Sequence, residues 1–400
     1  MDTRLTIRQT LFMFLFLSIS SIFNYIPNLA VSNAGGTGYI SVIYAGILLL
    51  IYVGLILQVL KVYPNKNLYD ILQEMIGVWA AKAIIFLYAI WAYVFVLVKV
   101  GAYSVTLQAT LMPSIHPGIL IVILFLLVLY TMSKNERTIF RFSEFLYQPV
   151  IFFLAVIFMF ALPNLEFQQL VPVSVSNLGD NLYTIPDICA IGGNLILVLF
   201  FCKHLVDRDN FNYMKKRLIN SVLAFVVISG LAIVLSVGLN GTESTAKLSY
   251  PIFQAIKGVS ILNSFERFDA LMTMIAMMSD FVAVIVFLQV TMLCLGWVFN
   301  YRKGENTALL NSRASQSLNM NNSLKVYGIA LFFIACVYIL LRNITQYEFE
   351  SFYRTFQIYF NLAFQYIIPV ILGFVCIGKQ WARHRREKKL SQGSEVAEQS

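Results

Sequence analysis

The chain has 400 residues, of which 59% are hydrophobic and only 12% are charged. A soluble domain carries about 25% charged residues, so this chain has too little polar surface to cover a water-soluble body of its size. The composition disfavours a soluble enzyme, a disordered chain, a nucleic-acid-binding module and a disulfide scaffold. It indicates a polytopic membrane protein. The net charge is +9, and the basic residues lie mostly in short loops between apolar runs.

Ten apolar runs reach, some narrowly, the roughly 20 residues that a membrane-spanning helix needs. Helix is the expected structure, because lipid offers no partner to an unpaired backbone amide. The first run lacks a small-residue cleavage site, so we interpret it as a retained helix and not as a signal peptide. The approximate limits are 9–31, 39–60, 80–111, 118–133, 140–162, 184–202, 217–239, 269–300, 324–342 and 355–378.

The distribution of Lys and Arg predicts the topology. With the N-terminus in the cytoplasm, the cytoplasmic segments hold 23 of these residues and the outer segments hold 5. This asymmetry favours ten helices with both termini inside. Residues 1–378 would form one membrane domain, and 379–400 a basic, then polar tail that we expect to be disordered. The loops predict an interfacial helix within 61–78 and a short outer helix around Pro251–Val259.

Helix breakers occur in the first and sixth runs, which stand five helices apart. The first run contains Ser20, Ser21, Asn24 and Pro27, and the sixth contains Pro186, Asp187, Gly192, Gly193 and Asn194. Transporters built from two inverted five-helix repeats place their broken helices at these equivalent positions, around a binding site near the midplane. We therefore expect broken helices 1 and 6. The alternative is that these residues only kink or pack the helices.

Two buried charges stand out in the third and eighth runs. Lys99 and Asp280 each lie deep in an apolar helix, where a charge costs about 2.5–3.5 kcal/mol and should face protein or water. Polar residues such as Tyr103 and Thr273 share their helix faces. We expect both faces to line one central cavity, with Asp280 as the counter-charge of Lys99. Two independent interhelical contacts, or side chains that reach the membrane surface, are the alternative.

Three loop motifs resemble the B subunits of spore germination receptors, a family of permease-like proteins. They are Lys61–Pro64 with Leu68, Ile71 and Gly77; Glu136, Ile139, Arg141, Glu144 and Pro149; and Tyr250–Pro251 with Phe265–Ala270. The resemblance implies the fold of the amino acid–polyamine–cation permease superfamily. It also implies a place in the spore inner membrane, beside an A subunit and a C-subunit lipoprotein, and a role in sensing nutrients. The family's break in helix 1 usually contains glycine, whereas Ser20–Tyr25 occupy that stretch here.

Two functions remain open from the sequence. The first is a receptor subunit that binds a small polar solute, such as an amino acid, and signals germination. The second is an ion-coupled secondary transporter of amino acids. We expect neither enzymatic activity nor a cofactor or metal. The predicted ligand-binding residues are Asn24, Tyr25, Lys99, Tyr103, Asp187, Gly192, Gly193, Asn194 and Asp280.

Overall fold

The computed structural model describes residues 6–64, 66–132, 136–170, 179–205, 210–258, 268–299, 322–342 and 346–382. The regular elements in these ranges are helices. Most of the predicted tail, from residue 383 on, lies outside the described residues, as does Val259 at the end of the predicted outer helix.

Eight helical segments are long and apolar enough to cross a membrane. Two shorter apolar segments, Pro117–Met132 and Val326–Leu340, lie in α5 (Pro117–Met132) and α14 (Asn322–Arg342), at the fourth and ninth predicted runs. The all-helical membrane fold is therefore confirmed. The eight long segments are α1 (Ile7–Ala34), α2 (Tyr39–Val62), α4 (Val78–Thr110), α6 (Glu136–Ala161), Asn181–Phe201, α10 (Phe211–Asn240), α13 (Phe268–Val298) and Ser351–Ala382.

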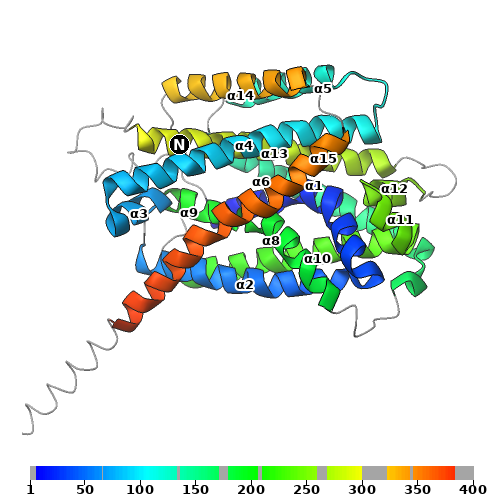
Figure 1. Cartoon of the computed structure of the whole chain (residues 1–400), viewed down its shortest axis with the longest axis horizontal. Coiled ribbons are helices and arrows are strands. Elements are labelled where there is room, and N and C mark those ends of the chain that lie inside the picture. The colour runs from blue at the N-terminus through cyan, green and yellow to red at the C-terminus, as the bar shows by residue number, and fades with distance from the viewer. Residues whose placement is uncertain are drawn as a thin grey trace, which may run out of the picture.

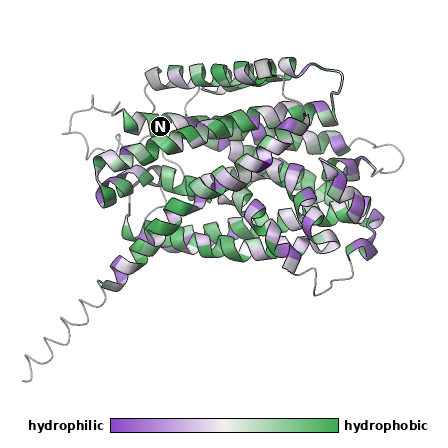
Figure 2. Ribbon diagram, viewed as in Figure 1, coloured by the Kyte–Doolittle hydropathy of each residue, from purple (hydrophilic) through white to green (hydrophobic). Residues whose placement is uncertain are grey.

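The long helices lie side by side, as Figure 1 shows, with α5 and α14 along one edge and α2 along the opposite edge. Hydrophobic residues predominate along the helices, and hydrophilic ones gather toward their ends (Figure 2). The first helix and the Asn181–Phe201 segment are the most enclosed, with 89% of the apolar window of each buried. These two segments therefore occupy the centre of the bundle, where a site between helices would lie.

The predicted break in the first helix is wrong, because α1 runs without interruption from Ile7 to Ala34 with Pro27 inside it. One rung of its hydrogen-bond ladder nevertheless has a partner in another helix. The Ser279 hydroxyl of α13 accepts from the Ser20 amide at 3.0 Å and donates to the Phe16 carbonyl. These two groups are partners in a regular α-helix, so the Ser279 hydroxyl bridges both ends of this rung.

The sixth predicted run is interrupted. It consists of η4 (Asn181–Thr184), α8 (Ile185–Gly192), η5 (Gly193–Ile196) and α9 (Leu197–Phe201). Its glycines permit close approach of neighbouring helices. A Cβ on Gly192 would stand 2.7 Å from a methyl carbon of Leu49 in α2, and one on Gly193 would stand 2.2 Å from the Oε1 of Gln365. We call Asn181–Phe201 the interrupted span.

The C-terminal span (Ser351–Ala382) begins inside α15 (Gln346–Thr355) and continues through two π-helical segments. These are η10 (Phe356–Asn361) and η11 (Ala363–Ile367). π-Helical turns are rare and occur frequently at functional sites. Their carbonyl groups find partners elsewhere in the bundle, because Tyr88 donates to Phe364 O at 2.7 Å and Tyr52 to Gln365 O at 2.6 Å.

Short helices at the ends of the spans agree with the loop predictions. The expected interfacial helix is α3 (Leu68–Ile76), which begins with a capping box between Asn67 and Asp70 and ends at Gly77, where φ is 86°. A side chain is rarely tolerated at such a φ, so the residue that turns the chain into α4 is glycine. On the opposite side lie α11 (Thr242–Lys247) and α12 (Pro251–Lys257), the second of which is the expected outer helix.

Candidate functional site

A buried ion pair joins α4 to α13. The Lys99 Nζ lies 2.9 Å from the Asp280 Oδ1, and the side chains of both residues are 1% exposed. The structure thus confirms that Asp280 is the counter-charge of Lys99. An ionised group enclosed in this way requires compensation by an opposite charge and by hydrogen bonds. The pair therefore forms a fixed polar centre inside an apolar bundle.

The first helix supplies the next contact of this pair. The Lys99 Nζ also donates to the Ser21 Oγ at 2.9 Å, and the Tyr353 hydroxyl donates to the same oxygen at 3.2 Å. The ring of Tyr353 stacks on that of Tyr25, with centroids 3.8 Å apart. Helices α1, α4, α13 and α15 therefore meet at one place, where the two stacked tyrosine rings cover the serine.

An unused acceptor lies one helical turn beyond Ser21. The Asn24 side-chain amide donates to the Thr106 hydroxyl at 3.2 Å and to the Ser20 hydroxyl at 3.4 Å. Its Oδ1 is buried and has no hydrogen-bond partner among the described residues. A buried acceptor without a donor is costly. A bound solute that carries an N–H or O–H group at this point would remove that cost.

Two further predicted residues belong to the same neighbourhood. Tyr103 lies one turn from Lys99 on α4 and interacts electrostatically with Asp280. Asp187, in the first turn of α8, is 4% exposed and interacts electrostatically with Arg354 and Tyr353. We call the group of Ser21, Asn24, Tyr25, Lys99, Tyr103, Thr106, Asp187, Asp280 and Tyr353 the outer polar layer.

The remaining predicted residues, Gly192, Gly193 and Asn194, form a second cluster with the C-terminal span. The Gln365 side-chain amide donates to the Asn194 Oδ1 at 3.0 Å, and Gly193 provides space for the Gln365 side chain. The Gln365 Oε1 is buried without a hydrogen-bond partner among the described residues. One turn away, Trp91 donates to the Asn361 Oδ1 at 2.9 Å. We call Trp91, Asn194, Asn361 and Gln365 the inner polar layer.

Sequence reasoning missed Ser279 and Tyr353. Ser279 adjoins Asp280, but nothing in the sequence indicates that its hydroxyl enters the ladder of another helix. Tyr353 had a detectable signal, because it precedes a polar series, Gln357, Asn361 and Gln365, by the same four-residue step. In an α-helix, side chains four residues apart differ by about 40° in direction around the helix axis. A π-helical turn contains more residues and reduces that difference.

The outer polar layer brings complementary charges and hydrogen-bonding groups together in the interior of the protein. This layer suits a small solute that carries a positive and a negative charge. It offers an ammonium, two carboxylates, hydroxyl groups and an unpaired amide oxygen. No group of three His, Cys, Asp or Glu side chains that could hold a metal ion occurs among the described residues. The arrangement supports the binding of such a solute through charges and hydrogen bonds.

Comparisons with known proteins identify the family and the fold. The pattern of the family described as "Spore germination protein" matches residues 4–313. The crystal structure of a manganese transporter from Eremococcus coleocola, in complex with an aromatic bis-isothiourea substituted compound, is similar in fold. Its TM-score is 0.54 at 16% identity, over 83% of this chain and 71% of that one. No curated protein matches the sequence. The chain thus belongs to the spore germination protein family and has a permease-like fold of the LeuT/APC type.

Proposed function

We propose that this protein is the permease-like membrane subunit of a nutrient-germinant receptor, and that it binds a small zwitterionic solute, such as an amino acid, in the outer polar layer. The buried Lys99–Asp280 pair is the observation that carries the proposal. A solute carboxylate would take the place of Asp280 beside Lys99. The solute ammonium would face Asp280 or Asp187, with the unpaired Asn24 Oδ1 as a further acceptor.

Binding of this kind would produce a signal because the protein rearranges its own ion pair. A ligand shifts a conformational equilibrium only by its differential affinity for the two states. When Lys99 binds the solute, Ser21 and Tyr353 lose the charge that now orders them. The helices that carry these residues would then move relative to one another. An A subunit and a C-subunit lipoprotein in the spore inner membrane would receive that change.

The proposed architecture has ten crossings in two inverted five-helix repeats, with both termini in the cytoplasm. The eight long and two short apolar segments supply ten helices in the expected order. The interrupted span occupies the position of the sixth helix. The first helix would contribute to the site near the rung that Ser279 bridges.

Binding to the purified protein tests the proposal. We expect a panel of L-amino acids to contain at least one that raises the melting temperature of the wild type. Lys99→Met and Asp280→Asn should each abolish that shift. Lys203→Met is a matched control, because Lys203 pairs with Asp70 at the surface. Unchanged shifts in both site variants would overturn the assignment of the site.

An amino acid transporter is the second candidate, favoured by the fold similarity to a transporter and by the interrupted span. Reconstituted vesicles distinguish the two. A transporter would show counterflow of labelled amino acid by this chain alone. A receptor subunit would bind without flux, and deletion of its gene would abolish germination in response to a nutrient. Neighbouring genes for a larger membrane subunit and a lipoprotein would also favour the receptor.

A further inference from the structure

An aromatic layer separates the outer and inner polar layers. In α4, Phe95 lies one turn, about 6 Å, from Lys99 on one side and one turn from Trp91 on the other. In α13, Phe287 lies two turns, about 10 Å, from Asp280. The rings of Phe95 and Phe287 are stacked, with centroids 3.7 Å apart. In both helices, therefore, an aromatic ring follows the charged residue, and the two rings lie at the same depth in the bundle.

The C-terminal span follows the same sequence of layers. Tyr353 belongs to the outer layer, Asn361 and Gln365 belong to the inner layer, and Phe356 lies between them. The Phe356 ring contacts Phe95 edge-on, with centroids 6.1 Å apart. Phe95, Phe287 and Phe356 are 4%, 0% and 2% exposed. Three helices thus each contribute one buried ring between two polar groups.

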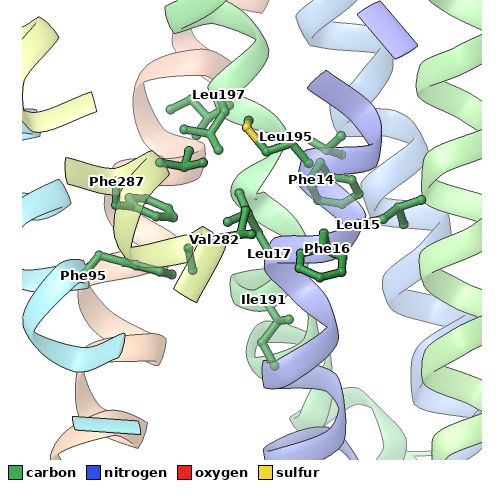
Figure 3. Close-up of a cluster of buried hydrophobic side chains, with 14 of the residues drawn as sticks. Phe14, Leu15, Phe16, Leu17, Phe95, Ile191, Leu195, Leu197, Val282 and Phe287 are labelled. Atoms are coloured by element: carbon green, nitrogen blue, oxygen red, sulfur yellow. The ribbon is translucent and has the colours of Figure 1, made fainter. Parts of the chain in front are cut away.

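Aliphatic side chains of the central helices complete this closure. Figure 3 shows Leu17 of α1, Ile191 of the interrupted span and Val282 of α13 in one buried cluster with Phe95 and Phe287. On the interrupted span, Ile191 lies between Asp187 and Asn194, so it follows the same order of polar, apolar and polar residues. The apolar cluster therefore lies between the charged pair and the inner layer.

We propose that Phe95, Phe287 and Phe356 form a hydrophobic gate between two polar compartments of this protein. A hydrophobic constriction blocks water and ions because it dewets. Opening it would join the Lys99–Asp280 pair to the inner layer. There the unpaired Oε1 of Gln365 is an acceptor for water or for a solute N–H group. The closed gate would keep a solute-binding protein from leaking ions.

Proton leak through reconstituted protein tests the gate without any solute. Liposomes of phosphatidylethanolamine and phosphatidylglycerol, loaded with a pH-sensitive dye, are energised by a potassium gradient and valinomycin. Phe287→Ala should raise the protein-dependent proton leak roughly tenfold over the wild type, because water would fill the space left by the ring. Phe287→Leu, which keeps more of the apolar volume, should give a smaller increase.

Phe225→Ala is the matched control. Phe225 is also fully buried and contacts another ring, Phe14, at 6.2 Å, but it lies between α10 and α1, away from the polar layers. Its loss should leave a cavity of similar size without raising the leak. An equal leak in the Phe225 and Phe287 variants would overturn the gate. If Phe287→Ala does not fold, the proton leaks of Phe287→Leu and Phe225→Leu are compared in the same way.

The gate and the proposed solute site are tested separately. A failure of amino acids to bind would leave the leak measurement unaffected, because a potassium diffusion potential drives the proton leak and no amino acid is present. A wild-type level of leak in the Phe287 variants would remove the gate and leave the ion pair as a binding site.

Discussion

At the scale of single residues, the Lys99–Asp280 pair makes a quantitative prediction. Breaking a buried pair by removing one partner costs about 3–5 kcal/mol, because the other charge stays buried without compensation. Lys99→Met and Asp280→Asn should therefore each lower the free energy of unfolding strongly. The double variant should lose much less than the sum of the two. Chemical unfolding in detergent, followed by tryptophan fluorescence, measures all three.

The Lys203–Asp70 pair provides the comparison. Its atoms are 3.5 Å apart, and its side chains are 36% and 33% exposed. An exposed pair contributes at most about 1 kcal/mol, so Lys203→Met should change stability little. Additive effects of the two substitutions at Lys99 and Asp280 would show that the two charges are not coupled.

The predictable part of the site follows from the cost of charge in lipid. Lys99 and Asp280 were identifiable from the sequence because a buried charge needs a partner of opposite charge. Few oppositely charged residues lie within the apolar runs. The role of Gly193 was not identifiable in this way. Its helical backbone needs no special φ, and its small size matters only because Gln365 approaches from a span about 170 residues away in sequence.

At the scale of helices, the rung of α1 that Ser279 bridges predicts the effect of Ser279→Ala. The Ser20 amide and the Phe16 carbonyl would lose their common partner. Either each group loses one hydrogen bond, at a cost of about 0.5–1.5 kcal/mol, or α1 shifts at this rung and moves Ser21 relative to Lys99. Both outcomes predict weaker binding at the outer polar layer, measured as a smaller thermal shift with an amino acid that binds the wild type.

Ser279→Thr keeps the hydroxyl group and should retain most of that binding. Ser221→Ala is a control, because Ser221 is also buried in a long helix but donates only to a carbonyl of its own helix, that of Leu218. Normal binding by Ser279→Ala would contradict a positioning role for the hydroxyl. The prediction of a broken first helix failed because polar residues and a proline can lie inside a continuous helix, as Ser20, Asn24 and Pro27 do in α1.

Close packing of α15 against α4 leads to a second prediction about helices. A Cβ on Gly101 would stand 2.4 Å from a ring carbon of Phe349. Gly101→Ala should therefore push α15 outward and draw Tyr353 away from Ser21, at an overpacking cost of about 1–3 kcal/mol. Phe349→Ala removes the obstructing ring, so the double variant should recover contact between Tyr353 and Ser21. Melting temperatures and amino acid binding of the three variants measure this, and equal defects in single and double variants would contradict it.

At the scale of the whole molecule, hydropathy predicted the helical runs well, because a spanning segment must be apolar over its full length. Local geometry was less predictable. The π-helical segments depend on tyrosine hydroxyls from α2 and α4 that take up carbonyls of the C-terminal span. Such partners come from distant parts of the chain, so a local pattern of residues does not reveal them. The order of the aromatic and polar layers likewise became visible only when three helices were aligned in space.

The orientation of the molecule in the membrane remains a prediction that chemistry can test. All five native cysteines are buried, so a membrane-impermeant maleimide should not label the wild type. Lys257 at the end of α12 and Lys379 near the end of the C-terminal span are exposed. The distribution of basic residues places Lys379 inside and Lys257 outside. Lys257→Cys should therefore react in intact cells, and Lys379→Cys only after permeabilisation. Labelling of both from the same side would change the number of crossings between them. It would also leave the second proposed repeat without its five crossings.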